Sequence, residues 1–234
     1  MLLDLAEETL KGRQMGHPDA CFIAVSSDAN RLASSGWHSD LVRLWDGPTG
    51  NLIKEFEAGL TARVYFTPDD REMIISRSKE FTFRDLKTLE VSRRLPRQIG
   101  LHPGHVAFTS DAKVMALEMA PGLIHLKEIS SGRTLAKLED PEGNLCTWMG
   151  FTPDGTQLVV AARYAGAIHR WDLRAIRARL KTMKLDWDWP EFPAATPAES
   201  MLSQYHRPMR VEVVGATLAV AAVSPSTNAP PARP

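Results

Sequence analysis

Short runs of alternating apolar and polar residues, separated by turn-forming residues, cover most of the first 173 positions of the chain. The clearest example lies in residues 21–56, where the runs CFIAV, RLASS, LVRLW and LIKEF are joined by SSDAN, GWHSD and DGPTG. Alternation with a period of two is typical of strands with one buried face, and Gly, Pro, Asp, Asn and Ser are typical of tight turns. The pattern therefore predicts four short antiparallel strands connected as consecutive hairpins.

This four-strand unit occurs four times along the chain. Its first turn contains an aspartate, at intervals of 41, 42 and 43 residues: Asp28, Asp69, Asp111 and Asp154. A second acidic position ends the third strand, at Asp46, Asp85, Glu128 and Asp172, and a glycine precedes each unit, at Gly16, Gly59, Gly100 and Gly143. One such sheet cannot bury both of its faces alone, so successive sheets are expected to stack as blades.

Several residues at fixed places in the unit resemble those of the WD-repeat β-propeller family. Trp45-Asp46 and Trp171-Asp172 match the terminal dipeptide of WD repeats, Gly16-His17 matches the opening dipeptide, and FTPDG at 151–155 matches the turn after the first strand. The resemblance covers roughly residues 1–173. It implies structural roles for His17, Trp45, Asp46, Trp171 and Asp172.

The chain also departs from the pattern of that family. The resemblance implies a buried His–Asp–Ser–Trp hydrogen-bond network, with the aspartate six residues before the tryptophan. In the first unit Asp40 stands five residues before Trp45, and in the second and third units Arg84 and Lys127 replace the tryptophan. The second and third blades are therefore expected to depend mainly on apolar packing.

The two ends of the repeat region are incomplete. Residues 1–10 are expected to supply only the outer strand of an earlier blade, and the last unit has three predicted strands. We therefore predict an all-β protein in which residues 1–172 form a β-propeller. Its blades, about four in number, are antiparallel sheets of four strands each. The preferred arrangement is an incomplete arc of a larger ring. A closed four-bladed ring and a dimeric eight-bladed ring are the alternatives.

A different pattern follows Asp172. In LRAIRARLKTMK the apolar residues have helical spacing, with Leu173, Ile176, Leu180 and Met183 on one face. Residues 173–189 are thus predicted to be a basic amphipathic helix and a DWDW cover, in which Trp187 and Trp189 shield an exposed propeller edge. Residues 190–234 are rich in Pro and Ala and are predicted to be a largely disordered tail, with a strand or short helix at 210–223.

The order of this helix, LDWDWPEFP and a proline-rich stretch also resembles the propeller end of large bacterial multidomain proteins. Some of those proteins carry a Ser/Thr protein kinase, although the chain itself has no kinase motif. The basic helix has two interpretations: contact with phosphate, RNA or an anionic membrane surface, or packing on the last blade with its charges in water. We favour the second.

Composition narrows the possible functions. The 28 basic and 28 acidic side chains give zero net charge, which argues against a nucleic-acid partner. Two cysteines exclude a disulfide framework and a four-cysteine zinc site. The longest apolar stretch of low charge, 213–223, is shorter than the roughly 20 residues that span a bilayer. We expect a cytoplasmic protein without membrane insertion.

No catalytic constellation is recognisable. The four turn aspartates are expected to lie far apart around a ring and to form turns. His102 and His105 lack an obvious third metal ligand, while Cys21 and Cys146 fall in first strands, where free cysteine behaves as a small hydrophobe. We therefore predict that the chain is not an enzyme and has no catalytic residue, metal or cofactor.

A protein partner is the remaining expectation. Loops between the second and third strands share a rim with the loops between blades, and aromatic, Met and Arg residues there suit protein contacts. The candidate contact residues are Trp37, His38, Arg77, Lys79, Met119, Arg163 and Tyr164. We expect a non-catalytic interaction scaffold, with possible self-association through open blade edges. The alternatives are an accessory regulatory or localising propeller of a larger bacterial signalling protein, such as a Ser/Thr kinase, and an enzyme or metal-binding protein that uses the central funnel.

Overall fold

The computed structural model describes residues 16–18, 20–98, 102–140, 142–163 and 166–192. The chain divides into two units, Met1–Pro193 and Ala194–Pro234, and the description below concerns the first. The strand predicted at 1–10, the element predicted at 210–223 and the tail from residue 193 onward lie outside the described residues.

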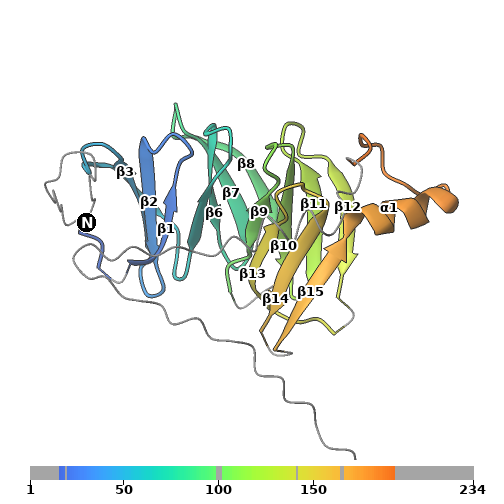
Figure 1. The fold of residues 1–234 in the computed structure, drawn as a ribbon. Helices are drawn as coiled ribbons and strands as arrows, with labels where there is room; N and C mark the ends of the chain where they lie inside the picture. Colours follow the sequence, from blue (N-terminus) through green and yellow to red (C-terminus); the bar gives the residue numbers. More distant parts are fainter. Residues whose placement is uncertain (1–15, 19, 99–101, 141, 164–165, 193–234) are drawn as a thin grey trace, which may run out of the picture. The chain divides into compact units, whose positions relative to one another are not determined.

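Fifteen strands of the described residues form four antiparallel sheets, and in each sheet the strands follow chain order (Figure 1). Sheet 1 consists of β1 (Ala20–Val25), β2 (Arg31–Gly36), β3 (Leu41–Asp46) and β4 (Leu52–Glu57). Sheet 2 consists of β5 (Arg63–Phe66), β6 (Glu72–Ser76), β7 (Glu80–Asp85) and β8 (Val91–Pro96). Sheet 3 consists of β9 (Val106–Phe108), β10 (Val114–Ala120), β11 (Leu123–Glu128) and β12 (Thr134–Glu139). Sheet 4 consists of β13 (Cys146–Phe151), β14 (Gln157–Ala162) and β15 (Ala167–Asp172).

These sheets confirm the predicted all-β propeller fold. The strands of sheet 1 agree with the four runs of residues 21–56 to within one residue at each end. Sheet 4 has three strands, as the repeat predicted, because the chain passes from β15 directly into helix α1 (Leu173–Thr182). In the described part of the chain no helix is both long enough and apolar enough to cross a bilayer.

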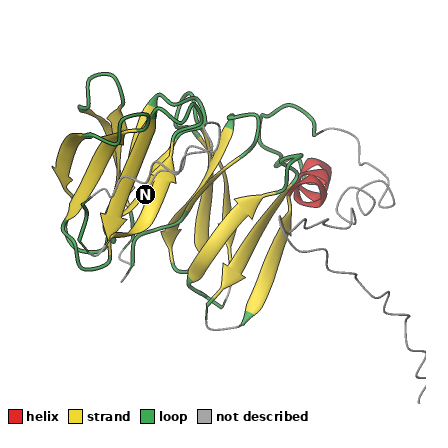
Figure 2. Cartoon of the chain, turned by 60° about the vertical axis from the view of Figure 1, so that its left-hand side comes forward, coloured by secondary structure: helices red, strands yellow, loops and turns green. Residues whose placement is uncertain are grey.

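Three hydrophobic clusters hold neighbouring sheets together. One joins sheets 1 and 2 around Leu44 and Met73, and another joins sheets 2 and 3 around Phe81 and Met115. The third joins sheets 3 and 4 and includes Leu173 of α1. Each blade thus buries its apolar faces against its neighbours in the chain, and Figures 1 and 2 show sheet 1 and sheet 4 at opposite ends of the row.

Each of the two outward faces of the row carries exposed apolar residues. On β1, Ile23 flanks Ala24, which packs between sheets 1 and 2, so strand alternation turns Ile23 to the opposite face, where it is 72% exposed. On sheet 4, Ile168 lies opposite Ala161 and is 75% exposed, and Trp148 of the same face is also exposed. Among the described residues, none of the three clusters joins sheet 4 to sheet 1.

The four repeated aspartates form turns, as predicted. In each turn a Ser or Thr hydroxyl donates a hydrogen bond of 2.6–2.7 Å to the carboxylate, from Ser26 to Asp28, Thr67 to Asp69, Thr109 to Asp111 and Thr152 to Asp154. The residue after each aspartate has a positive φ, at Ala29, Asp70, Ala112 and Gly155. The repeat in the sequence is therefore a repeat of one turn geometry.

A hydrogen-bonded network at the outward face of sheet 1 involves three residue types that the WD-repeat resemblance implies. His17 Nδ1 lies 2.6 Å from Ser34 Oγ, and Trp45 Nε1 donates to the same oxygen at 2.9 Å. The other ring nitrogen of His17 lies 3.1 Å from Ser39 Oγ. Ser39 stands six residues before Trp45, so a serine occupies the place that the resemblance assigns to an aspartate.

Candidate functional site

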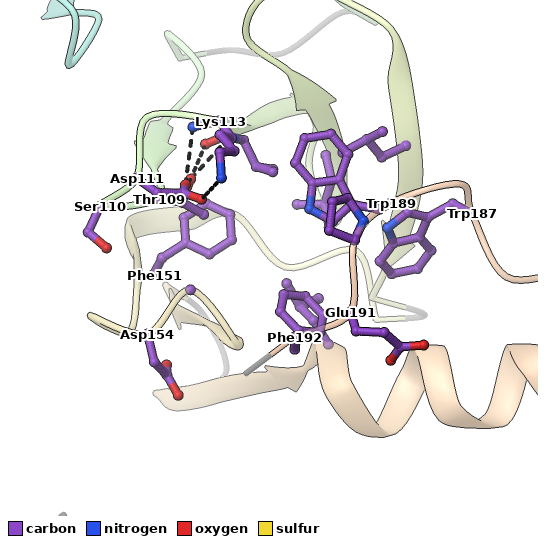
Figure 3. A pocket seen from close by; sticks show the side chains of 16 residues that line it. Thr109, Ser110, Asp111, Lys113, Phe151, Asp154, Trp187, Trp189, Glu191 and Phe192 are labelled. Atoms are coloured by element: carbon purple, nitrogen blue, oxygen red, sulfur yellow. Dashed lines mark hydrogen bonds and ion pairs between the residues drawn. The ribbon is translucent and has the colours of Figure 1, made fainter. Parts of the chain in front are cut away.

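A pocket of the described residues lies between sheet 3, sheet 4 and the segment after α1, and has a volume of about 310 Å³. Figure 3 shows four rings around it, from Phe151, Trp187, Trp189 and Phe192. We call it the aromatic pocket, and its other lining residues are Thr109, Ser110, Asp111, Lys113, Val114, Leu126, Leu135, Asp154, Gly155, Leu173, Pro190 and Glu191. It lies at the turns between the first and second strands of sheets 3 and 4.

Arg177 of α1 holds the segment that forms one wall. Its guanidinium pairs with both carboxylate oxygens of Asp186 at 3.0 Å and donates to the backbone carbonyls of Trp189 and Pro190 at 2.7 and 2.6 Å. Its Cζ also lies over the rings of Trp187 and Phe192, 5.3 and 5.4 Å from their centroids. One side chain thus fixes the positions of the aromatic residues that follow the helix.

The burial of Arg177 corrects an expectation from the sequence. The favoured interpretation left all the basic residues of the helix in water, yet Arg177 is only 5% exposed. It falls on the face of α1 that also buries Leu173, and Asp172 begins the helix by accepting a hydrogen bond from the backbone N–H of Ala175 at 2.9 Å. Arg177 is buried because Asp186 and two carbonyl groups satisfy its donors.

Three acidic residues and one lysine line the pocket. Burial raises the pKa of Asp154, but hydrogen bonds from Thr152 and Thr156 outweigh it and the pKa is lowered. The ammonium of Lys181, which is hydrogen bonded to Glu191, lowers the pKa of that carboxyl. Asp111 is paired with Lys113 at 3.3 Å. The carboxylates of Asp154 and Glu191 are therefore negatively charged at neutral pH, and both residues line the pocket.

This combination suits a ligand with an apolar stem and a positive tip. Ring faces attract cations through their quadrupole, and nearby carboxylates add a charge-assisted hydrogen bond. A volume of about 310 Å³ is at the small end for ligand pockets. The pocket therefore has room for a single long side chain.

The loop residues selected from the sequence lie at the opposite ends of the strands from this pocket. Trp37 stacks near His102, with 5.7 Å between ring centroids, and its carbonyl accepts from Thr61. Arg77 pairs with Glu80, while His38, Lys79 and Arg163 are exposed. The contact between Trp37 and His102 shows that the loop after β2 and the interblade loop before β9 share one rim.

Met119 is not a loop residue: it lies in β10, is 8% exposed and packs in the cluster between sheets 2 and 3. It was misplaced because β10 extends to Ala120, so that MAPG contributes only its last residues to the turn. Met119 is therefore withdrawn as a partner contact. Tyr164 lies outside the described residues, as does the side chain of Cys21.

Sequence reasoning missed most of the aromatic pocket. Trp187 and Trp189 were expected to cover a blade edge, and Trp189 does pack against the cluster of sheets 3 and 4. Phe151 and Phe192 were not selected, because nothing in their local sequence brings positions 151 and 192 together. The dense aromatic run from 187 to 192 was the available signal.

Comparison with known proteins adds a similarity of fold. No protein-family model and no curated protein matches the chain. Among the many solved structures with a similar fold is a chain of Kuenenia stuttgartiensis hydrazine synthase, with a TM-score of 0.57 and 15% identity. The match covers 71% of the present chain and 50% of that chain, so the present chain spans about half its length. Fold and comparison together define a protein of the β-propeller class, and the WD-repeat resemblance remains a prediction.

Proposed function

We propose that this chain is a non-catalytic interaction module, and that its aromatic pocket binds a Lys or Arg side chain of a protein partner. The observation that supports the proposal is a pocket lined by four aromatic rings whose lining also includes the acidic residues Asp154 and Glu191. Rings bind the aliphatic stem of such a side chain, and the carboxylates bind its charged end.

Arg177 supports this choice of ligand. Its guanidinium already lies over the rings of Trp187 and Phe192, so these rings accept a cation from the side of the helix. A cation–π contact contributes roughly 0.5–2 kcal/mol, depending on desolvation, and Arg is common at the centres of protein interfaces. One anchored side chain is thus enough for a specific interaction of modest affinity.

The test uses short peptides that differ only in the anchor. Fluorescently labelled Gly-rich peptides with a central Arg, Lys, citrulline or norleucine are titrated with the protein, and fluorescence anisotropy reports binding. Arg and Lys peptides should bind at least tenfold more tightly than the citrulline and norleucine peptides, a difference of about 1.4 kcal/mol. Trp187→Ala should weaken the binding of the Arg peptide by a similar factor.

Trp37→Ala is the matched control, because it removes a partly exposed tryptophan from the opposite rim. Equal affinity for the Arg and citrulline peptides would contradict the proposed ligand class. A loss of binding in Trp37→Ala but not in Trp187→Ala would move the site to the rim that the sequence first suggested.

One alternative from the sequence is a finer version of this proposal, whereas an enzyme or metal-binding protein that uses the central funnel is a different one. An accessory propeller of a larger bacterial signalling protein would use the same pocket to localise or regulate that protein. A cytoplasmic location and the lack of enzymatic activity also remain predictions, and they rest on the sequence.

A further inference from the structure

Three potential metal ligands meet in the interior, away from the aromatic pocket. His105 precedes β9, Glu118 lies in β10 and Cys146 begins β13. One ligand atom from each lies within 4.8 Å of the other two. His105 is 7% exposed and Glu118 is 3% exposed. The fold therefore brings a nitrogen, an oxygen and a sulfur donor together at the contact between sheets 3 and 4.

Hydrogen bonds orient the three side chains. The Glu118 carboxylate accepts the backbone N–H groups of His105 at 3.0 Å and of Cys146 at 3.2 Å. The His105 ring is hydrogen bonded to the backbone of Cys146. A ligand histidine commonly uses one ring nitrogen in such a bond, which leaves the lone pair of the other nitrogen for a metal. The cluster is thus positioned before any ion binds.

Two arginines lie near the cluster and set its charge. The positive charges of Arg63 and Arg97 act on both His105 and Glu118. Arg97 donates through Nε to the backbone carbonyl of Glu118, and through Nη1 to the carbonyls of Arg77, Ser78 and His102. Because all of these acceptors are backbone carbonyl oxygens, Arg97 does not use the carboxylate oxygens of Glu118. Their remaining lone pairs are therefore available to a ligand.

From this geometry we propose that His105, Glu118 and Cys146 bind one zinc-class divalent cation. Imidazole, carboxylate and thiolate together suit Zn²⁺ or Co²⁺, whereas Mg²⁺ and Ca²⁺ select oxygen ligands. Binding replaces the S–H bond of Cys146 with a sulfur–metal bond, and the proton leaves to solvent. The carboxylate and the thiolate then balance the two charges of the ion despite the nearby arginines.

A fourth ligand position is available beside the cluster. Glu118 and Cys146 line a small cavity of about 20 Å³, together with Asp140 and His169. A cavity of this size holds about one water molecule. Three protein ligands with one exchangeable position distinguish this arrangement from a closed, four-ligand structural zinc site.

The test measures metal binding by the full chain. Metal-free protein is titrated with Co²⁺, and one equivalent should produce a thiolate-to-cobalt charge-transfer band in the near ultraviolet, which Zn²⁺ should abolish by displacement. His105→Gln and Cys146→Ser should each weaken Zn²⁺ binding at least tenfold in competition with a chromogenic chelator. His102→Gln and Cys21→Ser are the matched controls and should bind as the wild type does.

The wild-type titration alone can overturn the proposal, whether or not every variant folds. Absence of the charge-transfer band at one equivalent of Co²⁺, with circular dichroism showing a folded protein, would show that the cluster binds no such ion. Loss of the band in Cys21→Ser, with retention in Cys146→Ser, would equally contradict it. Neither result would affect the proposed role of the aromatic pocket, because the two sites share no lining residue.

Discussion

At the scale of single residues, the repeat is maintained by a recurring hydrogen bond from a Ser or Thr hydroxyl to the turn aspartate. Ser26 donates to Asp28 at 2.7 Å and also accepts the backbone N–H of Arg31, so it closes the turn between β1 and β2. Asp28 then accepts the backbone N–H of Asn30. Ser, Thr and Asp favour such turns because their short side chains reach backbone groups a few residues away.

This contact predicts a measurable change in the titration of Asp28. The hydrogen bond from Ser26, followed by those from Asn30, lowers the pKa of Asp28 below its ordinary value. Ser26→Ala removes the largest of these effects, so the pKa of Asp28 should rise toward that of a free aspartate. The shift is measured by NMR titration of the side-chain carboxyl carbon.

The pH dependence of folding stability should reflect this lowered pKa of Asp28. Because the pKa of Asp28 is lower in the folded state, its contribution to stability is present above the pKa of the unfolded chain and is lost as the pH falls through the folded value. Ser26→Ala should therefore lose less stability on acidification than the wild type. Ser27→Ala is the control, since that hydroxyl donates to the carbonyl of Pro68 instead. An unchanged Asp28 titration in Ser26→Ala would contradict the explanation.

At the scale of elements, α1 and the segment that follows it act as one cover over sheet 4. Leu173 and Arg177 are the buried residues of the helix, and Phe192 packs against the cluster of sheets 3 and 4. Apolar spacing in the sequence predicted the helix correctly. It could not predict that a cation would occupy the buried face, because the partners of Arg177 lie 9 to 13 residues further along the chain.

Replacing Arg177 should release this cover. In Arg177→Met the carboxylate of Asp186 and the carbonyls of Trp189 and Pro190 lose their donors, which destabilises the cover because these acceptors are left without that partner. We expect faster hydrogen exchange over residues 185–192 and weaker binding of the Arg peptide. Mass spectrometry of exchanged peptides measures the first effect.

Arg179→Met provides the comparison within the same helix, since Arg179 is exposed. Both substitutions put the same methionine in place of an arginine, so they change side-chain size, helix propensity and charge by the same amounts. Equal exchange in the two variants would show that charge on the helix, and not the contacts of Arg177, holds the cover.

At the scale of the whole molecule, the main feature is a row of blades whose two outward faces each carry exposed apolar residues. Inside the row the corresponding faces are buried between neighbouring sheets, so Ile23 and Ile168 are exposed where a blade would normally have a neighbour. Burying a side chain of this size contributes about 1.5–3 kcal/mol. Exposed sheet faces of this kind favour association.

We predict that the isolated chain self-associates through these faces, with sheet 4 of one copy against sheet 1 of another. Analytical ultracentrifugation should show a concentration-dependent dimer or larger species. Ile168→Asp and Ile23→Asp should each shift the equilibrium to the monomer, because a charge replaces an exposed apolar side chain of the associating face. Both variants keep the core clusters intact.

Leu60→Asp tests whether any exposed apolar residue has the same effect. Leu60 is as exposed as Ile23, but it lies in the loop between β4 and β5, away from the outward faces. It should leave the association unchanged. A monomer at all concentrations in the wild type would make the prediction wrong.

The amino-acid sequence by itself determined the strands, the turns and the helix. Period-two alternation, a turn at Asp28 and its equivalents, and helical spacing from Leu173 are local signals, since strand and turn preferences act over a few residues. The repeat then predicted blades, because repeated sheets of this kind bury their apolar faces against one another. The all-β propeller class followed from the pattern alone.

Only the tertiary structure decided which side chains meet. The aromatic pocket combines Phe151 with Phe192, and the proposed metal site combines His105 with Glu118 and Cys146. These contacts depend on how one sheet packs on the next, and on where a helix ends. Such packing depends on summed contacts between residues far apart in the chain, so no local pattern records it.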